Sequence, residues 1–141
     1  MAIIETENLT KRFKNVTAVD GLNLKIERGE IFGLVGPDGA GKTTTIRLLA
    51  AIMNPTEGRA TVAAYDTVKE AEEIKKVIGY MPQRFSLYGD LSVMENLHFF
   101  ADIFEVRENE RKERIRSLLR FSRLEEFQGR RVDHLSGGMQ K

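Results

Sequence analysis

Hydrophobic and polar residues follow two different periods along the chain, and the period changes near Asp90. Before Asp90, short apolar runs alternate with turns, whereas after it apolar residues recur at the spacing of an α-helix. Ile3–Leu9 predicts an edge strand, and Ala18–Ile26, with apolar side chains at alternate positions, predicts a half-buried strand. A turn at Arg28–Glu30 follows, so we expect the first thirty residues to be mainly β.

Ile31–Val35 is apolar on both faces, which is typical of a central strand. A glycine-rich stretch follows it, and then a helix from about Thr43 to Met53, which Asn54–Gly58 breaks. The next predicted elements are a strand, a short helix and a second strand, over Arg59–Ala64, Thr67–Lys76 and Val77–Met81. Strands and helices that alternate in this way predict an α/β core.

Two helices are predicted after Asp90. Ser92 can cap the first, and Glu95, three residues further on, completes a capping box. Apolar residues then recur at helical spacing, at Leu97, Phe100, Ala101 and Phe104. The second helix spans Glu108–Ser122 and interleaves acidic with basic residues. This interleaving predicts a solvated helix face with ion pairs, and a specific anionic partner is the alternative.

Composition excludes several classes of protein. The 141 residues suffice for one domain, and 22 lysines and arginines against 21 aspartates and glutamates give a net charge of +1. Bulk charge therefore gives no support to nucleic-acid binding, and we expect no nucleic-acid partner. The absence of cysteine excludes a disulfide framework and a thiolate metal site. With no apolar run near the roughly 18 residues of a membrane span and no visible signal peptide, we expect a cytoplasmic location.

The strongest motif is Gly36-Pro37-Asp38-Gly39-Ala40-Gly41-Lys42-Thr43, which matches G-x-x-x-x-G-K-[ST] in full. Glycines let the backbone approach phosphate oxygens, and successive amides can form an anion nest at the positive end of the next helix. Lys42 would neutralise the β- and γ-phosphates, and the Thr43 hydroxyl would bind a bridging magnesium ion. The alternative is a glycine turn with an incidental lysine. The loop alone leaves kinases, GTPases, helicases and transport ATPases open.

Two further motifs narrow the class. Leu135-Ser136-Gly137-Gly138-Met139-Gln140-Lys141 ends the chain, and Tyr80-Met81-Pro82-Gln83 lies between it and the phosphate loop. Together with Gly36–Thr43, they resemble in order and spacing the signature, the Q-loop and the Walker A loop of ATP-binding cassette (ABC) ATPases. The resemblance covers essentially the whole chain. Within the family, Ser86–Leu97 looks most like ATPase subunits of drug, antibiotic and polysaccharide exporters.

The resemblance implies a nucleotide site. Phe13 falls where an aromatic ring stacks on adenine, an interaction that needs a flat ring but no hydrogen-bond pattern. The phosphates of ATP would lie against the loop and the start of its helix, at Gly36, Pro37, Asp38, Gly39, Ala40, Gly41, Lys42, Thr43 and Thr44. From the residues alone, Phe13 has a second interpretation as a core residue of an edge strand.

The resemblance also implies catalytic roles, with ATP and Mg²⁺ as cofactors. Lys42, Gln83 and Ser136 would assist catalysis, and Thr43 and Gln83 would contact the metal. Two domains would face each other head to tail. The signature loop of one domain, at Ser136, Gly137 and Gly138, would contact the γ-phosphate of the ATP that is bound to the other domain. The alternatives are a polar loop residue at Gln83 and a serine-capped helix start at Ser136.

As a fold, the resemblance implies an α/β protein: a P-loop NTPase core with an antiparallel β subdomain and a helical subdomain, incomplete at the C-terminus. Residues 1–141 would form a single ABC-type ATP-binding domain. Within it, we expect a β subdomain, a core from P-loop to Q-loop, a helical subdomain and the signature, over 1–30, 31–89, 90–134 and 135–141. The expected partners are a second ATP-binding domain and transmembrane permease subunits, at the cytoplasmic face of a membrane.

The family pattern continues past Lys141 with an apolar strand ending in Asp and Glu, a D-loop and a switch histidine, which this sequence lacks. These groups would hold magnesium, orient the attacking water and contact the γ-phosphate. The absent strand would lie beside Ile31–Val35, which would then keep an unpaired apolar edge that costs stability and invites aggregation. We therefore hypothesise that the chain is a C-terminally truncated piece of a longer ATPase.

The function that follows is ATP binding and hydrolysis that powers transport of a substrate across a membrane, with export favoured. The parent protein would be an ABC-type ATPase, whereas the 141 residues alone are expected to bind nucleotide without turning it over. For the 141 residues as given we therefore favour a fragment that only binds, over one that also hydrolyses ATP. A soluble ABC ATPase that serves translation or DNA repair remains open as the alternative for the parent protein.

Overall fold

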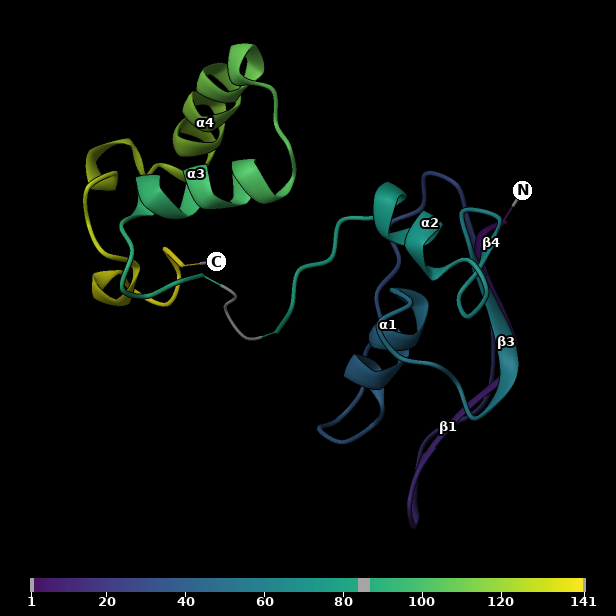
Figure 1. Cartoon of the computed structure of the whole chain (residues 1–141). Helices are drawn as coiled ribbons and strands as arrows, with labels where there is room; N and C mark the ends of the chain where they lie inside the picture. Colours follow the sequence, from purple (N-terminus) through teal and green to yellow (C-terminus); the bar gives the residue numbers. More distant parts are fainter. Residues whose placement is uncertain (1, 84–86, 141) are drawn as a thin grey trace. The chain divides into compact units, whose positions relative to one another are not determined.

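The computed structural model of the chain describes residues 2–83 and 87–140. The chain divides into two compact units, Met1–Met81 and Pro82–Lys141 (Figure 1). Met1, Ser86 and Lys141, which begin or end segments predicted above, lie outside the described residues. No helix within the described ranges is long and apolar enough to cross a membrane.

The first unit is built on a four-stranded antiparallel sheet with strand order β2-β1-β3-β4 (Figure 1). The strands are β1 (Ala2–Phe13), β2 (Val16–Glu27), β3 (Glu57–Val62) and β4 (Tyr65–Asp66). Ile4 of β1 faces Ile26 on one side and Val62 on the other. The predicted strands over 18–26 and 59–64 are thereby confirmed, the latter as β3 with shifted ends.

β1 is an inner strand, so the predicted edge position of Ile3–Leu9 is wrong. An inner strand of an antiparallel sheet with one solvated face alternates in polarity just as an edge strand does, so the pattern cannot separate the two. Glu7 lies on the solvated face and accepts hydrogen bonds from Arg59 of β3 at 2.9 and 2.6 Å, whereas the neighbouring Thr6 is buried.

Helix α1 (Lys42–Leu49) packs against the sheet through Leu48, which is fully buried. It shares a core cluster with the strands, made of Leu9, Val19, Leu48 and Ala60. The helix ends earlier than the predicted Met53, because Ala51 takes a left-handed φ of 54° and its amide donates to Leu48 O at 3.1 Å. A tightened last turn of this kind closes the helix on its own carbonyls.

Helix α2 (Ala71–Val77) completes the first unit and buries Ile74 against Ala51 and Val62. It starts four residues later than the predicted Thr67–Lys76. Before it, the Asp66 carboxylate accepts from the amides of Val68 and Lys69, both at 2.9 Å. Such local bonds from an aspartate stabilise a turn in competition with a helix.

Neither of the other two predicted strands of the first unit forms. Ile31–Val35 is a segment without regular structure, in which Ile31 and Val35 are 104% and 94% exposed. Among the described residues, no hydrogen bond is made to its backbone. Val77–Met81 fails as a strand too, because α2 runs to Val77 and regular structure then stops. A strand needs a hydrogen-bonding neighbour, which an apolar run alone does not supply.

The second unit contains α3 (Val93–Ile103), α4 (Glu108–Ser122) and two 3-10 helices, η1 (Glu125–Phe127) and η2 (Val132–His134) (Figure 1). Both predicted helices are confirmed. The capping box is present, because the Glu95 amide donates to Ser92 Oγ at 3.2 Å and the Ser92 amide donates to Glu95 Oε2 at 2.7 Å. The core is formed by Val93, Ile115, Leu119, Val132 and Leu135.

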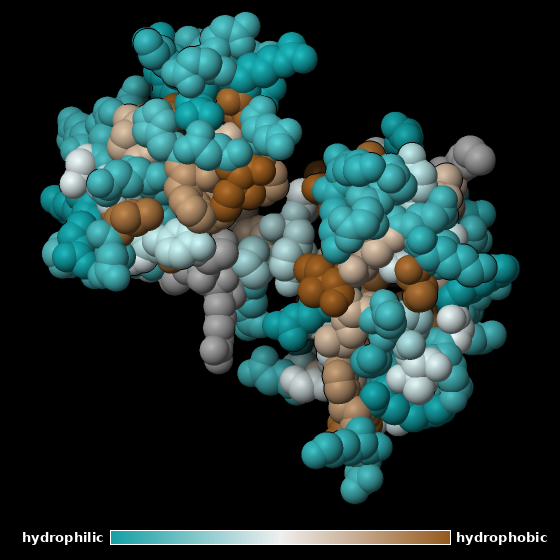
Figure 2. All heavy atoms as spheres, viewed as in Figure 1, coloured by the Kyte–Doolittle hydropathy of each residue, from teal (hydrophilic) through white to brown (hydrophobic). Residues whose placement is uncertain are grey.

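Asn96 connects α3 to the segment before it. Its side chain is buried, accepts from the Tyr88 amide at 2.8 Å and donates to the carbonyls of Tyr88 and Ser92, both at 3.0 Å. The outer face of α4 carries the predicted ion pairs, such as Arg114 with Glu110 at 2.8 Å. Figure 2 shows hydrophobic side chains gathered within the otherwise hydrophilic surface of each unit.

Candidate nucleotide-binding site

The phosphate-loop motif forms an exposed loop in the first unit, between the irregular segment 31–35 and α1. A turn opens it, with the Ala40 amide donating to Pro37 O at 3.3 Å. Gly39 and Gly41 have φ values of 82° and 83°, in the left-handed region that favours glycine. The sequence therefore supplies glycine at the two loop positions where a side chain would be strained.

Gly41 is also the point where the loop touches the sheet. A Cβ atom at this position would lie 2.0 Å from the carbonyl oxygen of Ala18 in β2. Only glycine allows this approach, because a methyl group would collide with backbone rather than with a side chain that can move. The contact holds the amino end of α1 against β2 and thereby positions the loop. Sequence reasoning missed it, since no local signal connects Ala18 with Gly41.

Lys42 begins α1 and its side chain returns to the start of the loop. The Nζ atom donates to Gly36 O and to Pro37 O, both at 2.6 Å. An ammonium group has three donors, so one remains for an anion. The positive charge is thus held at the loop rather than extended into solvent.

The amino end of α1 is suited to an anion. No side chain among the described residues caps it, and its first turn holds no acidic residue. The first helical hydrogen bond runs from the Thr45 amide to Gly41 O at 2.8 Å. Unpaired amides at a helix start carry a partial positive charge that attracts phosphate.

A magnesium ion fits this end of the helix only together with phosphates. Among residues 2–83 and 87–140 there is no group of three histidines or carboxylates that could hold a metal. The hydroxyl of Thr43, half-buried and next to Lys42, is a neutral oxygen of the kind that Mg²⁺ accepts beside phosphate oxygens and water.

Phe13 lies at the end of β1 opposite Val16 and is 43% exposed. The interpretation of Phe13 as a core residue is therefore wrong. Lys11 Nζ lies 5.3 Å from the ring centroid, within the range of a cation–π contact. An exposed, flat ring in the first unit is available for stacking.

The remaining candidate residues belong to the second unit. Gln83 is exposed near its start. Ser136, Gly137 and Gly138 are exposed and follow the buried Leu135. Ser136 O accepts from the amides of Met139 and Gln140 at 2.9 and 3.1 Å, so this segment makes one helical turn but no helix within the described residues. The structure thus groups the loop and Phe13 in one unit and Gln83 with the signature in the other.

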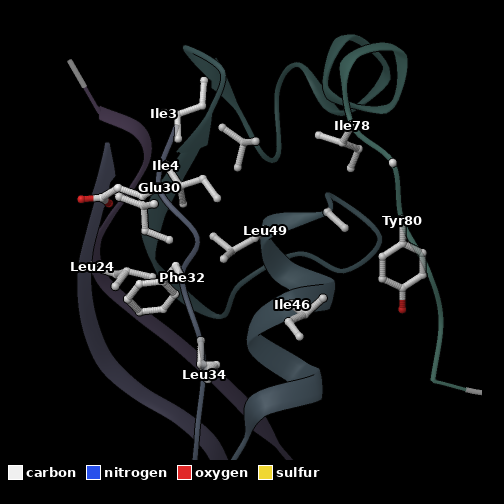
Figure 3. A pocket seen from close by; sticks show the side chains of 14 residues that line it. Ile3, Ile4, Leu24, Glu30, Phe32, Leu34, Ile46, Leu49, Ile78 and Tyr80 are labelled. Atoms are coloured by element: carbon white, nitrogen blue, oxygen red, sulfur yellow. The ribbon is translucent and has the colours of Figure 1, made fainter. Parts of the chain in front are cut away.

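The structure also contains an apolar groove that sequence reasoning did not anticipate. It lies in the first unit between the sheet, segment 31–35 and α1, and its volume is about 380 Å³. Figure 3 shows Ile4, Phe32, Leu34, Ile46 and Leu49 around this space. Phe32 and Leu34 line the groove and Ile31 and Val35 do not, a difference for which the sequence carries no signal because both faces of this run are apolar.

Comparisons with known proteins support the resemblance to ABC ATPases that the sequence motifs indicate. Residues 19–141 match the protein-family model described as ABC transporter. The probable multidrug ABC transporter ATP-binding protein YbhF of Escherichia coli (strain K12) is 46% identical in an alignment 142 residues long, which covers 99% of this chain and 25% of the relative. The Nod factor export ATP-binding protein I of Cupriavidus pinatubonensis is 38% identical over 140 residues, 99% of this chain and 43% of the relative.

A solved structure shares the fold. The dimeric post-hydrolysis state of the ATP-binding cassette MJ0796 bound to ADP and Pi matches with a TM-score of 0.83 and 30% identity, over 97% of this chain and 65% of that chain. The predicted fold class is confirmed for the part of the fold that this chain covers. The chain spans from a quarter to less than half of the length of the two curated relatives.

Proposed function

The chain belongs to the ABC transporter family, and on this premise we propose that it carries the nucleotide-binding part of an ATPase that powers export across a membrane. The names of two relatives, one a probable multidrug transporter protein and the other a Nod factor export protein, favour export. The whole protein would lie at the cytoplasmic face of the membrane and act on transmembrane permease subunits.

One observation carries the proposal. Gly41 lies against Ala18 of β2, so that the loop and the amino end of α1 present backbone amides while Lys42 Nζ stays at the loop. This arrangement suits a polyphosphate, whose charge the lysine and the helix start would neutralise.

The residues of the first unit would divide the work of binding. The adenine would stack on Phe13, and the phosphates would lie along the loop and the start of α1 against Gly36, Pro37, Asp38, Gly39, Ala40, Gly41, Lys42, Thr43 and Thr44. The Thr43 hydroxyl would contact magnesium, which when bound supplies positive charge to the β- and γ-phosphates. The resemblance implies a further metal contact by Gln83, which belongs to the second unit.

The chemistry would be in-line attack of water on the γ-phosphorus, which breaks the bond to the β–γ bridging oxygen. Lys42 would stabilise the negative charge that develops on the phosphates. In a head-to-tail pair, a second copy would add the donors of its signature loop, Ser136, Gly137 and Gly138. We assign turnover to the longer protein, because the resemblance places the water-orienting carboxylate after Lys141.

Binding of a fluorescent ATP analogue to the 141-residue chain tests the proposal. Lys42→Ala should weaken binding roughly 10- to 100-fold, since a charged hydrogen bond is worth about 1.5–3 kcal/mol. Lys69→Ala is the matched control, because Lys69 is an exposed lysine of the same unit outside the loop, and it should bind as the unaltered chain does. Equal affinities of the two variants would contradict a phosphate site at the loop.

Two further measurements separate the alternatives. Phosphate release from the 141 residues, abolished by Lys42→Ala, would show that the chain hydrolyses ATP and would exclude a fragment that only binds. Co-purification of the longer protein with ribosomes or DNA, rather than with a membrane protein, would favour the soluble ABC ATPase. We expect no phosphate release and a membrane partner.

A further inference from the structure

Asp38 places a carboxylate inside the loop that the proposed function uses to hold polyphosphate. It is exposed and occupies the second position of the turn that the Ala40 amide closes on Pro37 O at 3.3 Å. An acidic side chain is unexpected in an anion-binding loop, because it repels the ligand. The carboxylate should therefore affect how the loop binds a nucleotide.

The charge of Asp38 is not cancelled by a partner. Its carboxylate makes no hydrogen bond or ion pair with any residue that the structure describes. Lys42 directs its ammonium to the carbonyls of Gly36 and Pro37, which precede Asp38. The loop thus carries one full positive and one full negative charge, and the partial charge of the helix start is added to that balance.

Repulsion between two charges grows with their product. Magnesium neutralises roughly half of the charge of a triphosphate, so the carboxylate repels the metal-free nucleotide about twice as strongly as the metal-bound one. We propose that Asp38 is a specificity-determining residue that makes the loop select magnesium-bound over metal-free triphosphates. This inference rests on the proposed function and adds to it a residue that makes binding depend on the metal.

The test compares Asp38→Asn with the unaltered chain. Asparagine keeps the size of the side chain and suits the same turn, but carries no charge. The dissociation constant of ATP is measured at low salt, once with excess Mg²⁺ and once with a chelator. The ratio of the metal-free to the metal-bound constant should fall about threefold in Asp38→Asn, mainly because metal-free ATP binds more tightly. Added salt should shrink this difference, since it screens exposed charges.

Asp20→Asn is the control. Asp20 is an exposed aspartate of β2, and its substitution changes the net charge by the same amount outside the loop. Its ratio should equal that of the unaltered chain. An unchanged ratio in Asp38→Asn would overturn the inference, as would a weaker binding of the magnesium form, which would make Asp38 a metal contact.

The outcomes also separate the inference from the proposed function. If the unaltered chain binds ATP and the ratio does not move, only the role of Asp38 is overturned. If the folded chain binds no nucleotide with or without magnesium, the proposed function falls and the role of Asp38 with it. Circular dichroism of each variant establishes that the chain is folded in either case.

Discussion

The two units of the molecule differ in how completely their backbone groups are hydrogen-bonded and their apolar side chains are buried. In the second, the capping box of Ser92 and Glu95 closes the start of α3, and Asn96 holds the segment before it. In the first, the sheet and α1 share a core, yet segment 31–35 makes no backbone hydrogen bond within the described residues and exposes Ile31 and Val35.

This difference follows from the nature of the two kinds of element. A helix pairs its own amides and carbonyls, and a short cap completes it, so a helical unit can be self-contained. A strand pairs only with another strand, so an apolar segment without a neighbour presents unpaired groups to solvent. Such a segment, 31–35, precedes the phosphate loop and does not fix its position. The loop is instead held at its other end, where Gly41 contacts Ala18 of β2 at the start of α1.

The largest effect is expected from Gly41→Ala, which tests this fixed point. The added Cβ would lie 2.0 Å from Ala18 O at a φ of 83°. Left-handed strain of about 1–2 kcal/mol and a clash of about 1–3 kcal/mol should together destabilise the first unit by about 3 kcal/mol. Urea unfolding measures the loss. Gly39→Ala is the matched control, with a φ of 82° but nothing within 4 Å, and should cost only about 1 kcal/mol.

Equal losses in the two glycine variants would contradict the account, because the contact with β2 would then contribute nothing. The same pair should differ in nucleotide binding. Both variants should weaken binding, because both glycines belong to the proposed phosphate loop, and Gly41→Ala should weaken it more because it also displaces the loop from β2.

Asn96→Ala should have the next largest effect, in the second unit. Asn96 is 2% exposed, and its loss removes the acceptor of the Tyr88 amide, while the carbonyls of Tyr88 and Ser92 each keep a backbone amide as donor. A buried donor left without its acceptor costs about 1–3 kcal/mol, which hydrogen exchange of α3 amides would register. The control is His98→Ala, an exposed position on the same helix, for which we expect a change within about 0.5 kcal/mol. Similar losses in both variants would show that Asn96 does not hold this unit together.

Ser92→Ala removes half of the capping box and should destabilise α3 by about 1 kcal/mol. Ser117→Ala makes the same chemical change at an exposed position inside α4, where alanine is a good helix former, and should cost nothing. Thermal unfolding monitored at 222 nm would distinguish them. A larger loss in Ser117→Ala than in Ser92→Ala would refute the role of the cap.

The other half of the capping box predicts a pH dependence. The hydrogen bond from the Ser92 amide, followed by that from its hydroxyl, lowers the pKa of Glu95 below its ordinary value of 4.5. Because the pKa of Glu95 is lower in the folded state than in the unfolded state, ionised Glu95 stabilises α3 at pH values above the ordinary pKa of 4.5. This contribution is lost as the pH falls through the folded-state pKa.

Glu95→Gln tests the pH dependence. The unaltered chain should lose more stability than this variant when the pH is lowered from 6 to about 3. Glu126→Gln, an exposed glutamate of η1, is the control and should lose as much as the unaltered chain. If acidification weakens Glu95→Gln just as much, the ionised cap does not contribute.

The smallest effect on unfolding is expected for Val35→Lys. Val35 is 94% exposed, so the change should alter the free energy of unfolding by no more than about 0.5 kcal/mol. Light scattering should nevertheless show less self-association, because a lysine on an unpaired segment opposes strand pairing between copies. Phe121→Lys, at a 90% exposed position of α4, should reduce self-association less. Equal reductions would point to general hydrophobicity rather than to this segment.

Local signals account for what could be predicted from the sequence. The cap at Ser92 and the helix over Glu108–Ser122 depend on residues a few positions apart, and the structure has both. The edge position of Ile3–Leu9 and the strands at Ile31–Val35 and Val77–Met81 were wrong, because each depends on neighbours distant in the sequence. The phosphate loop itself is a local pattern, whereas its contact with Ala18 becomes visible only once β2 is placed beside it.

The central claim is that the backbone around Gly39–Lys42, together with the Lys42 ammonium, binds the phosphates of a nucleotide. Amide chemical shifts of the ¹⁵N-labelled chain, recorded as magnesium-ATP is added, test it most directly. The account predicts that the largest shifts fall on the amides of Gly36 and of residues 38–44, and that Lys42→Ala needs roughly 10- to 100-fold more nucleotide to produce them while the folded spectrum remains. Saturating shifts confined to other residues, with 36–44 unmoved, would contradict it.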